Sequence, residues 1–198
     1  MTTISDYRDE RLRKLSEIKT LGIDPFPAHS NRNTKISDIL DRFSDYDQKT
    51  VIIAGRIVAI RSFGKLAFVK LRDYFGEIQL FMKQEGEVKN GLVSVKQLKL
   101  LDLGDFVEAE GVVGKSQTGE ISVFTNAVRL LTKALRPLPG RDGFTNKEER
   151  YRRRYVDMNV NPEVRERLVR RSIFWQATRD FMNQHGFIEI NTPILEHT

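Results

Sequence analysis

The residues whose types and spacing best suit ligand binding lie in the run 66–72. Side chains of a strand alternate between its two faces. One face of this run carries small apolar residues that suit a core, namely Ala67, Val69 and Leu71. Phe68 lies on the other face with Lys70 and Arg72. An aromatic ring beside cations on an outward face commonly holds a base of a single-stranded nucleic acid. The alternative is a ring covered by a loop or by the N-terminal helix, and both interpretations stay open here.

The next run, 77–82, adds an amide to the same surface. It alternates in the same way, with one apolar face that consists of Ile78, Leu80 and Met82. Gln79 lies on the opposite face with Glu77 and Phe81. We therefore expect Phe68 and Gln79 to share one outward surface.

The elements that position these residues are predicted strands joined by glycine turns. Strands are expected over residues 51–60, 65–72, 77–82, 106–113 and 120–130, with a helix over 92–103. Gly55 inside the first strand predicts a bulge or a sharp bend. Three consecutive strands, a helix and two further strands are the pattern of a five-stranded oligonucleotide-binding (OB) barrel, whose second and third strands form the binding face.

Helices are expected before this barrel. Residues 5–21 carry an apolar stripe at helical spacing, and a shorter helix is expected from Ile36. The other faces of the first helix are basic. They could follow a phosphate backbone or could form a solvated face. We predict residues 1–50 to be an N-terminal helical extension and residues 51–132 to be the barrel domain.

The segment after the barrel predicts a domain boundary. Residues 133–147 contain a proline-rich stretch and are expected to be a linker. Asn161 and Pro162 predict the start of a helix that runs to about His185 before Gly186 ends it. A short strand is expected over 187–190. This helix is too apolar to stand alone, so residues 148–198 are interpreted as the opening of a further domain.

Composition narrows the function classes. The chain has 198 residues, a net charge of +6 and a pI near 9.6, which fits a polyanionic partner such as nucleic acid. It has no cysteine, which excludes thiolate metal sites and cysteine catalysis. The scattered histidines do not have the spacing of metal ligands, so no metal site is predicted. No membrane span or signal peptide is predicted, and the expected location is the cytoplasm.

Several segments resemble the N-terminal portion of bacterial class II lysyl-tRNA synthetases. The resemblance covers nearly the whole chain. Its proline linker and its tyrosine–arginine segment favour the lysine enzymes over the related aspartate and asparagine enzymes. The segments that carry it are GR at 55–56, GKLAF at 64–68, LTKALRPLP at 131–139, RYRRRYVD at 150–157 and GFIEINTP at 186–193.

The resemblance implies a role for the outward face of the barrel, because this domain binds the tRNA anticodon in the family. Phe68 is then the ring that stacks on the central anticodon base, and Gln79 hydrogen-bonds that base. Arg61 and Glu120 are further anticodon contacts. A carboxylate near RNA costs repulsion unless it accepts a hydrogen bond from a base N–H.

The resemblance also implies which parts of the enzyme this sequence lacks. The segment 186–193 resembles motif 1 of the class II enzymes, which forms their dimer interface. Motifs 2 and 3 do not appear, so the fold expected after the linker is the helix plus strand that begin an α+β catalytic domain. Family members attach lysine to tRNA-Lys with ATP and magnesium and form homodimers. We expect no catalytic residue and no cofactor site in this chain, which should be inactive alone.

Two other functions stay open at the level of sequence. The chain could be a free-standing OB-fold RNA-binding module without ligase activity. It could also be a general single-strand-binding protein whose affinity is insensitive to sequence.

Overall fold

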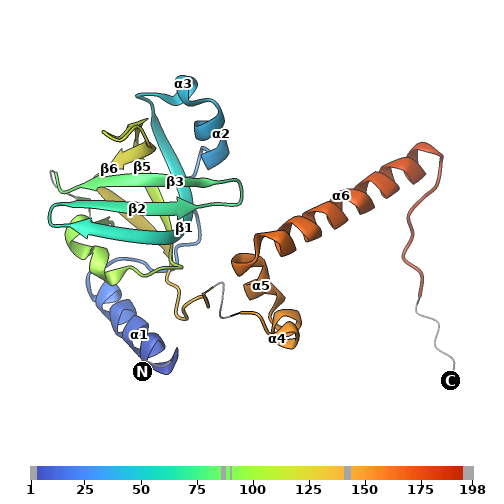
Figure 1. Cartoon of the computed structure of the whole chain (residues 1–198), viewed down its shortest axis with the longest axis horizontal. Helices are drawn as coiled ribbons and strands as arrows, with labels where there is room; N and C mark the ends of the chain where they lie inside the picture. Colours follow the sequence, from blue (N-terminus) through green and yellow to red (C-terminus); the bar gives the residue numbers. More distant parts are fainter. Residues whose placement is uncertain (1–3, 86–87, 90, 141–143, 194–198) are drawn as a thin grey trace. The chain divides into compact units, whose positions relative to one another are not determined.

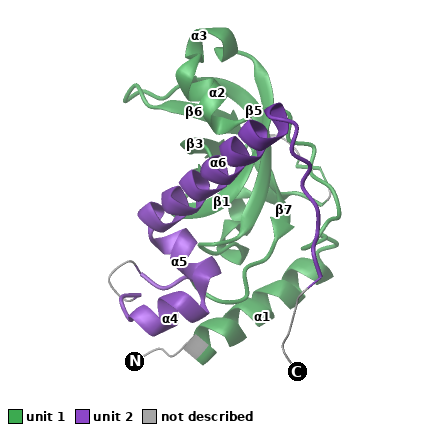
Figure 2. Cartoon of the chain, turned by 90° about the vertical axis from the view of Figure 1, so that its right-hand side faces the viewer, with its two compact units in different colours: residues 1–137 green, residues 138–198 purple. Residues whose placement is uncertain are grey.

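The computed structural model describes residues 4–85, 88–89, 91–140 and 144–193. The chain divides into two compact units, residues 1–137 and residues 138–198 (Figures 1 and 2). The division falls inside the predicted linker. Each unit is described by itself below.

The first unit is a closed barrel. Its five strands are β1 (Thr50–Phe63), β2 (Leu66–Arg72), β3 (Glu77–Lys83), β5 (Phe106–Lys115) and β6 (Ile121–Thr125), and a further strand, β7 (Ala127–Thr132), pairs with β5. Strands β1, β2 and β3 form an antiparallel meander, β3 pairs in parallel with β6, and β5 pairs with both β6 and β1. The pairing of β5 with β1 closes a five-stranded OB barrel, as predicted.

Alternation along β2 and β3 places the core as expected. The inward residues of both strands expose at most 2% of their surface, among them Ala67, Val69 and Leu71. Phe68 and Gln79 are half-buried on the outer face. Burying one face of each strand sets the register, because a slip by one residue would turn the apolar set toward water.

Two predicted elements of the first unit differ from the structure. The predicted fifth strand is two strands, β6 and β7, interrupted at Asn126, where the Thr125 hydroxyl donates to the Ala127 carbonyl (2.8 Å). The predicted helix over 92–103 is a two-residue strand, β4 (Val93–Ser94), followed by a 3₁₀ helix, η1 (Val95–Leu100). Strand β4 pairs with β7. The apolar spacing of a short segment does not separate these outcomes, because tertiary pairing decides between them.

The bend predicted at Gly55 lies further along β1. The register with β2 shifts between Ile57 and Ala59, so Val58 is the bulged residue. A Cβ atom on Gly55 would lie 2.9 Å from the carbonyl oxygen of Arg72. Glycine at position 55 is therefore explained by the close approach of β2 and not by the bulge itself.

Helices precede the barrel: α1 (Ile4–Thr20), α2 (Ile36–Asp41) and α3 (Phe43–Tyr46). Several basic residues of α1 contact the protein itself. Arg11 donates to the carbonyls of Ala134 (2.9 Å) and Leu103 (3.0 Å). Arg13 pairs within the helix, with Glu10 and Glu17. These contacts favour a structural role for this face over a path for a phosphate backbone.

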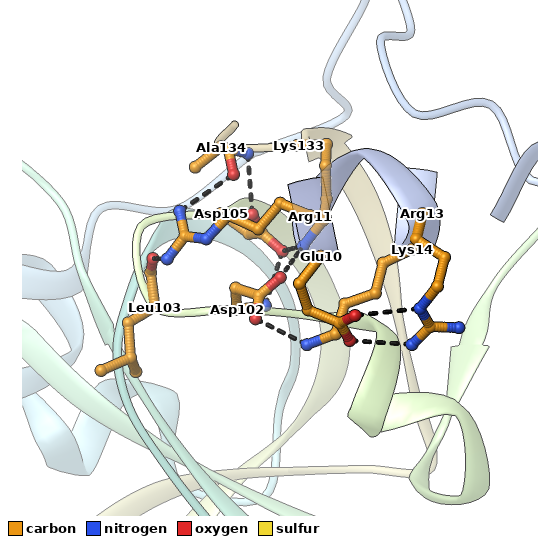
Figure 3. A network of polar contacts seen from close by, with 9 residues as sticks. All are labelled: Glu10, Arg11, Arg13, Lys14, Asp102, Leu103, Asp105, Lys133 and Ala134. Carbon is orange, nitrogen blue, oxygen red and sulfur yellow. Dashed lines mark hydrogen bonds and ion pairs between the residues drawn. The ribbon is translucent and has the colours of Figure 1, made fainter. Parts of the chain in front are cut away.

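A buried charge cluster joins α1 and the end of β7 to the turn before β5 (Figure 3). Lys133 and Asp105 are fully buried or nearly so and pair at 2.7 Å, and Lys133 also contacts Asp102. Asp102 receives a further bond, of 2.7 Å, from Lys14. Burial raises the pKa of Asp105 despite its bond to Lys133. Burial also opposes ionisation of Asp102, but hydrogen bonds from Lys133 and Lys14 outweigh it and hold the pKa of Asp102 below its ordinary value.

The second unit is helical, with α4 (Lys147–Arg152), α5 (Arg154–Val160) and α6 (Pro162–Gln184). The predicted helix over 161–185 is confirmed, and Gly186 follows its end with a positive φ of 81°. Asn161 occupies the N-cap position of α6, but its side chain does not cap the helix. The Asn161 amide donates instead to buried Asp157 (2.7 Å).

Most apolar residues of α6 are exposed. Phe174 exposes 62% of its surface and Trp175 exposes 48%. The strand predicted over 187–190 is wrong: this segment has no regular secondary structure, because none of the described residues pairs with it. The final residues of the predicted catalytic-domain start, 194–198, lie outside the described part of the chain.

Candidate nucleic-acid interface

A hollow of about 430 Å³ lies on the outer face of the barrel. All four residues predicted to contact nucleic acid line it: Arg61, Phe68, Gln79 and Glu120. The remaining lining residues are Ala59, Phe63, Lys70 and Thr118. Residues from β1, β2, β3 and the β5–β6 turn thus meet at one place.

Cross-strand pairing holds these residues together. Arg61 on β1 lies directly opposite Phe68 on β2. Lys70 on β2 lies opposite Gln79 on β3. Directly opposite residues of an antiparallel pair carry their side chains on the same face, about 5 Å apart at Cβ. The guanidinium, the ring and the amide therefore belong to one continuous surface that the sheet register creates.

The bulge at Val58 determines which residues at the end of β1 lie on this surface. Before the bulge, the odd-numbered residues of β1 face the core, including Ile53 and Ile57. The extra residue reverses this alternation, so Ile60 packs against the core and Arg61 lies on the outer face with Phe68. Without the bulge, Arg61 would point into the barrel.

Phe68 is part of a row of aromatic rings across the outer face. Its ring packs edge-on against Phe63 (6.2 Å between centroids) and against Phe81 (5.1 Å), and Phe81 contacts Phe124 (5.2 Å). The neighbouring rings pack against Phe68, which stays partly open to the hollow. The alternative interpretation of Phe68, a ring fully covered by a loop or by α1, does not fit this arrangement.

The charged side chains around the hollow differ in whether they already form ion pairs. Lys70 pairs with Glu77 (3.4 Å), which partly neutralises it. Within the described ranges, neither the Arg61 guanidinium nor the Glu120 carboxylate forms a hydrogen bond or an ion pair. Arg61 is therefore available to a phosphate or a base plane, and Glu120 is available to a base N–H.

The sequence pattern did not identify Phe63 as a site residue, because it predicted a turn at Phe63. Strand β1 extends through Phe63, and the turn begins at Gly64, which has a positive φ of 61°. Phe63 exposes 63% of its surface. The alternation of Arg61 and Phe63 beyond the bulge could have indicated this position.

Within the described ranges, no group of three or more His, Asp or Glu side chains is placed to hold a metal ion. None of the helices among the described residues is long and apolar enough to span a membrane.

Comparison with known proteins adds two family matches. Residues 51–131 match the family of the OB-fold nucleic acid binding domain. Residues 146–198 match the family of the class II tRNA synthetases (D, K and N). The two matches follow each other along the chain, one on the barrel and one on the segment that contains α4–α6.

Curated relatives agree with these matches over most of the chain. Lysine–tRNA ligase of Carboxydothermus hydrogenoformans is 43% identical over 186 residues, which is 93% of this chain and 38% of the relative. The ligase of Syntrophomonas wolfei is 40% identical over 98% of this chain and 39% of its own length. That of Clostridium botulinum strain Langeland is 38% identical over 96% of this chain and 38% of its own length.

The chain thus spans 38–39% of the length of these relatives. Within that span it combines the closed OB barrel with the start of the synthetase segment. Over nearly its whole length this chain is therefore similar to lysine–tRNA ligases, and it fits their N-terminal portion.

Proposed function

We propose that this chain is the tRNA-binding portion of a lysine–tRNA ligase and that it binds the anticodon loop of tRNA-Lys. The observation that carries the proposal is the hollow on the barrel, where an aromatic ring, an amide and an unengaged guanidinium meet. A ring holds a base by stacking, an amide reads its edge, and a guanidinium serves the backbone or a base plane.

The roles follow from these chemistries. Phe68 stacks on the central anticodon base, and Gln79 hydrogen-bonds the edge of that base. Arg61, directly opposite Phe68, contacts a phosphate or the plane of a neighbouring base. Glu120 accepts a hydrogen bond from a base N–H, since otherwise its charge would repel the RNA.

At the level of the longer protein, we propose ATP-dependent attachment of lysine to tRNA-Lys in the cytoplasm by a homodimer. Lysine, ATP and magnesium would act outside this chain. Among the described residues no group of three or more His, Asp or Glu side chains is placed to hold a metal ion, and the proposal assigns this chain tRNA binding and no chemical step. The purified chain should therefore show no lysine-dependent exchange between ATP and pyrophosphate, and measurable exchange would contradict this assignment.

Titration with an anticodon stem-loop of tRNA-Lys tests the proposed binding. Fluorescence anisotropy should show tighter binding of this stem-loop than of one with the same stem and a scrambled loop. If the chain contacted only phosphates, it would bind both stem-loops equally. The ratio of the two dissociation constants therefore measures recognition of the loop sequence. Both titrations belong at two salt concentrations, because the electrostatic part of the affinity falls with salt.

The second candidate function, general single-strand binding, makes the opposite prediction. Its supporting observation is the row of aromatic rings, because stacking tolerates any base. Equal affinities for the two stem-loops would favour it and would reject anticodon recognition. The free-standing RNA-binding module makes the same binding prediction as the ligase portion, and the sequence of the gene beyond codon 198 separates the two.

Phe63 should also contribute to binding. Replacing Phe63 by alanine should weaken stem-loop binding by about 1 kcal/mol, because an exposed ring at the rim of the hollow can stack on a second base. Phe75→Ala is the matched control: Phe75 is 46% exposed in the neighbouring β2–β3 turn but does not line the hollow. A loss of equal size in both variants would mean that Phe63 has no specific contact.

A further inference from the structure

Ser122 lies directly behind the amide of Gln79. It is fully buried on β6, opposite Gln79 in the parallel pairing of β3 with β6. Gln79 Nε2 lies 3.1 Å from Ser122 Oγ, and Ser122 Oγ lies 3.1 Å from the carbonyl oxygen of Glu120. Ser122 does not line the hollow itself.

The hydroxyl proton decides the direction of this chain of hydrogen bonds. A serine hydroxyl has one proton to donate, and the Glu120 carbonyl can only accept. Ser122 therefore donates to Glu120 and must accept from Gln79. Of the two ends of the Gln79 amide only the NH₂ group can donate, so Nε2 faces Ser122.

This arrangement leaves the other end of the amide available to a ligand. Gln79 Oε1 has no hydrogen-bond partner among the described residues, and no side-chain oxygen or nitrogen there is both buried and unpartnered. Oε1 is therefore open to the hollow that Gln79 lines. The second N–H of the amide is not used by Ser122.

The orientation of an amide matters for pyrimidines because uracil and cytosine have the same shape. Uracil presents N3–H beside a carbonyl oxygen, whereas cytosine presents an N3 acceptor beside an amino group. An amide can pair with either base, but only with its oxygen and nitrogen exchanged. If stacking on Phe68 holds the ring in place, an amide that cannot turn over pairs with one of the two.

We propose that Ser122 is a positioning residue that prevents the Gln79 amide from turning over and thereby makes the hollow select uracil over cytosine. This inference rests on the proposed binding of the anticodon loop. Ser122 acts through Gln79 and does not touch the RNA.

The test compares stem-loops that differ only in uracil or cytosine at the central anticodon position. In the wild-type chain the uracil loop should bind more tightly. In Ser122→Ala the dissociation constant of the cytosine loop divided by that of the uracil loop should fall by about threefold to tenfold, which corresponds to the loss of one hydrogen bond. Ser122→Thr keeps the hydroxyl and should restore the ratio. Thermal melting of both variants checks that the barrel is intact.

An NMR measurement tests the hydrogen bond without RNA. In the wild-type chain one of the two side-chain amide protons of Gln79 should exchange slowly with solvent, and in Ser122→Ala both should exchange fast. Unprotected protons in the wild type, or an unchanged ratio in a folded Ser122→Ala variant, would overturn the proposal for Ser122.

The outcomes separate this inference from the proposed function. If Gln79→Ala lowers the ratio and Ser122→Ala does not, anticodon reading stands and the role of Ser122 fails. If the wild-type chain binds both loops equally, the proposed reading of the anticodon fails and the role of Ser122 fails with it.

Discussion

Replacing Phe68 by alanine should weaken binding of the tRNA-Lys anticodon stem-loop by about 1–3 kcal/mol, the contribution of one base stacked on an aromatic side chain. The barrel should keep its fold, because Phe68 lies on the outer face and the core of β2 consists of other residues. Fluorescence anisotropy measures the loss, and circular dichroism checks the fold.

Phe68→Leu separates stacking from packing. Leucine retains apolar bulk against the rings of Phe63 and Phe81, but it has no aromatic face. If stacking explains the contribution of Phe68, the leucine variant should bind nearly as weakly as the alanine variant. Wild-type affinity in Phe68→Leu would mean that the ring only supports its neighbours, and an unfolded Phe68→Ala would mean that it belongs to the core.

Replacing Lys133 by methionine should reduce the free energy of unfolding of the barrel by about 3–5 kcal/mol, as removal of one partner from a buried ion pair typically does. The side chains of Lys133 and Asp105 are both fully buried and pair at 2.7 Å. Without the lysine, Asp105 must remain charged without its cation or must take up a proton. Urea denaturation followed by far-ultraviolet circular dichroism measures the change.

The matched control is Arg13→Ala, which removes the exposed pairs of α1 with Glu10 and Glu17. Its urea midpoint should stay near that of the wild type, because exposed ion pairs contribute little. The double variant Lys133→Met with Asp105→Asn should recover part of the loss, since it removes the stranded charge. A wild-type midpoint for Lys133→Met would show that the buried pair does not stabilise the barrel.

The pH dependence of the Lys133→Met deficit has a definite sign. Burial already raises the pKa of Asp105, and loss of Lys133 should raise it further. When the pKa of a carboxyl group is higher in the folded state than in the unfolded state, the protein loses stability as the pH rises from the unfolded pKa through the folded pKa. The deficit should therefore be largest near neutral pH and should shrink as the pH falls toward the ordinary pKa of aspartate.

Local patterns were sufficient for much of the barrel. Burial of one face requires period-two alternation, so the order of residues along β2 and β3 is enough to assign their core positions. The same alternation placed Phe68 and Gln79 on a common outer face. The helix α6 was predictable too, because Pro162 and Gly186 mark its limits through backbone geometry alone.

Where an element depends on a distant partner, local patterns failed. The helix predicted over 92–103 is instead β4 and η1, because β4 pairs with β7. The strand predicted over 187–190 does not form, because no described residue pairs with it. Lys133 was predicted to begin a linker, yet its ammonium group is buried between Asp102 and Asp105, which precede it by 31 and 28 residues.

The candidate site shows the same division. Residue types and alternation were enough to predict a stacking ring and a base-reading amide, since these predictions depend only on neighbours along one strand. The position of Arg61 beside Phe68 depends on the bulge at Val58 and on the register of β1 with β2. The hydrogen bond between Gln79 and Ser122 depends on the parallel pairing of β3 with β6, in which opposed residues are 43 positions apart. Such contacts arise from closure of the barrel, which the pattern of a single segment does not encode.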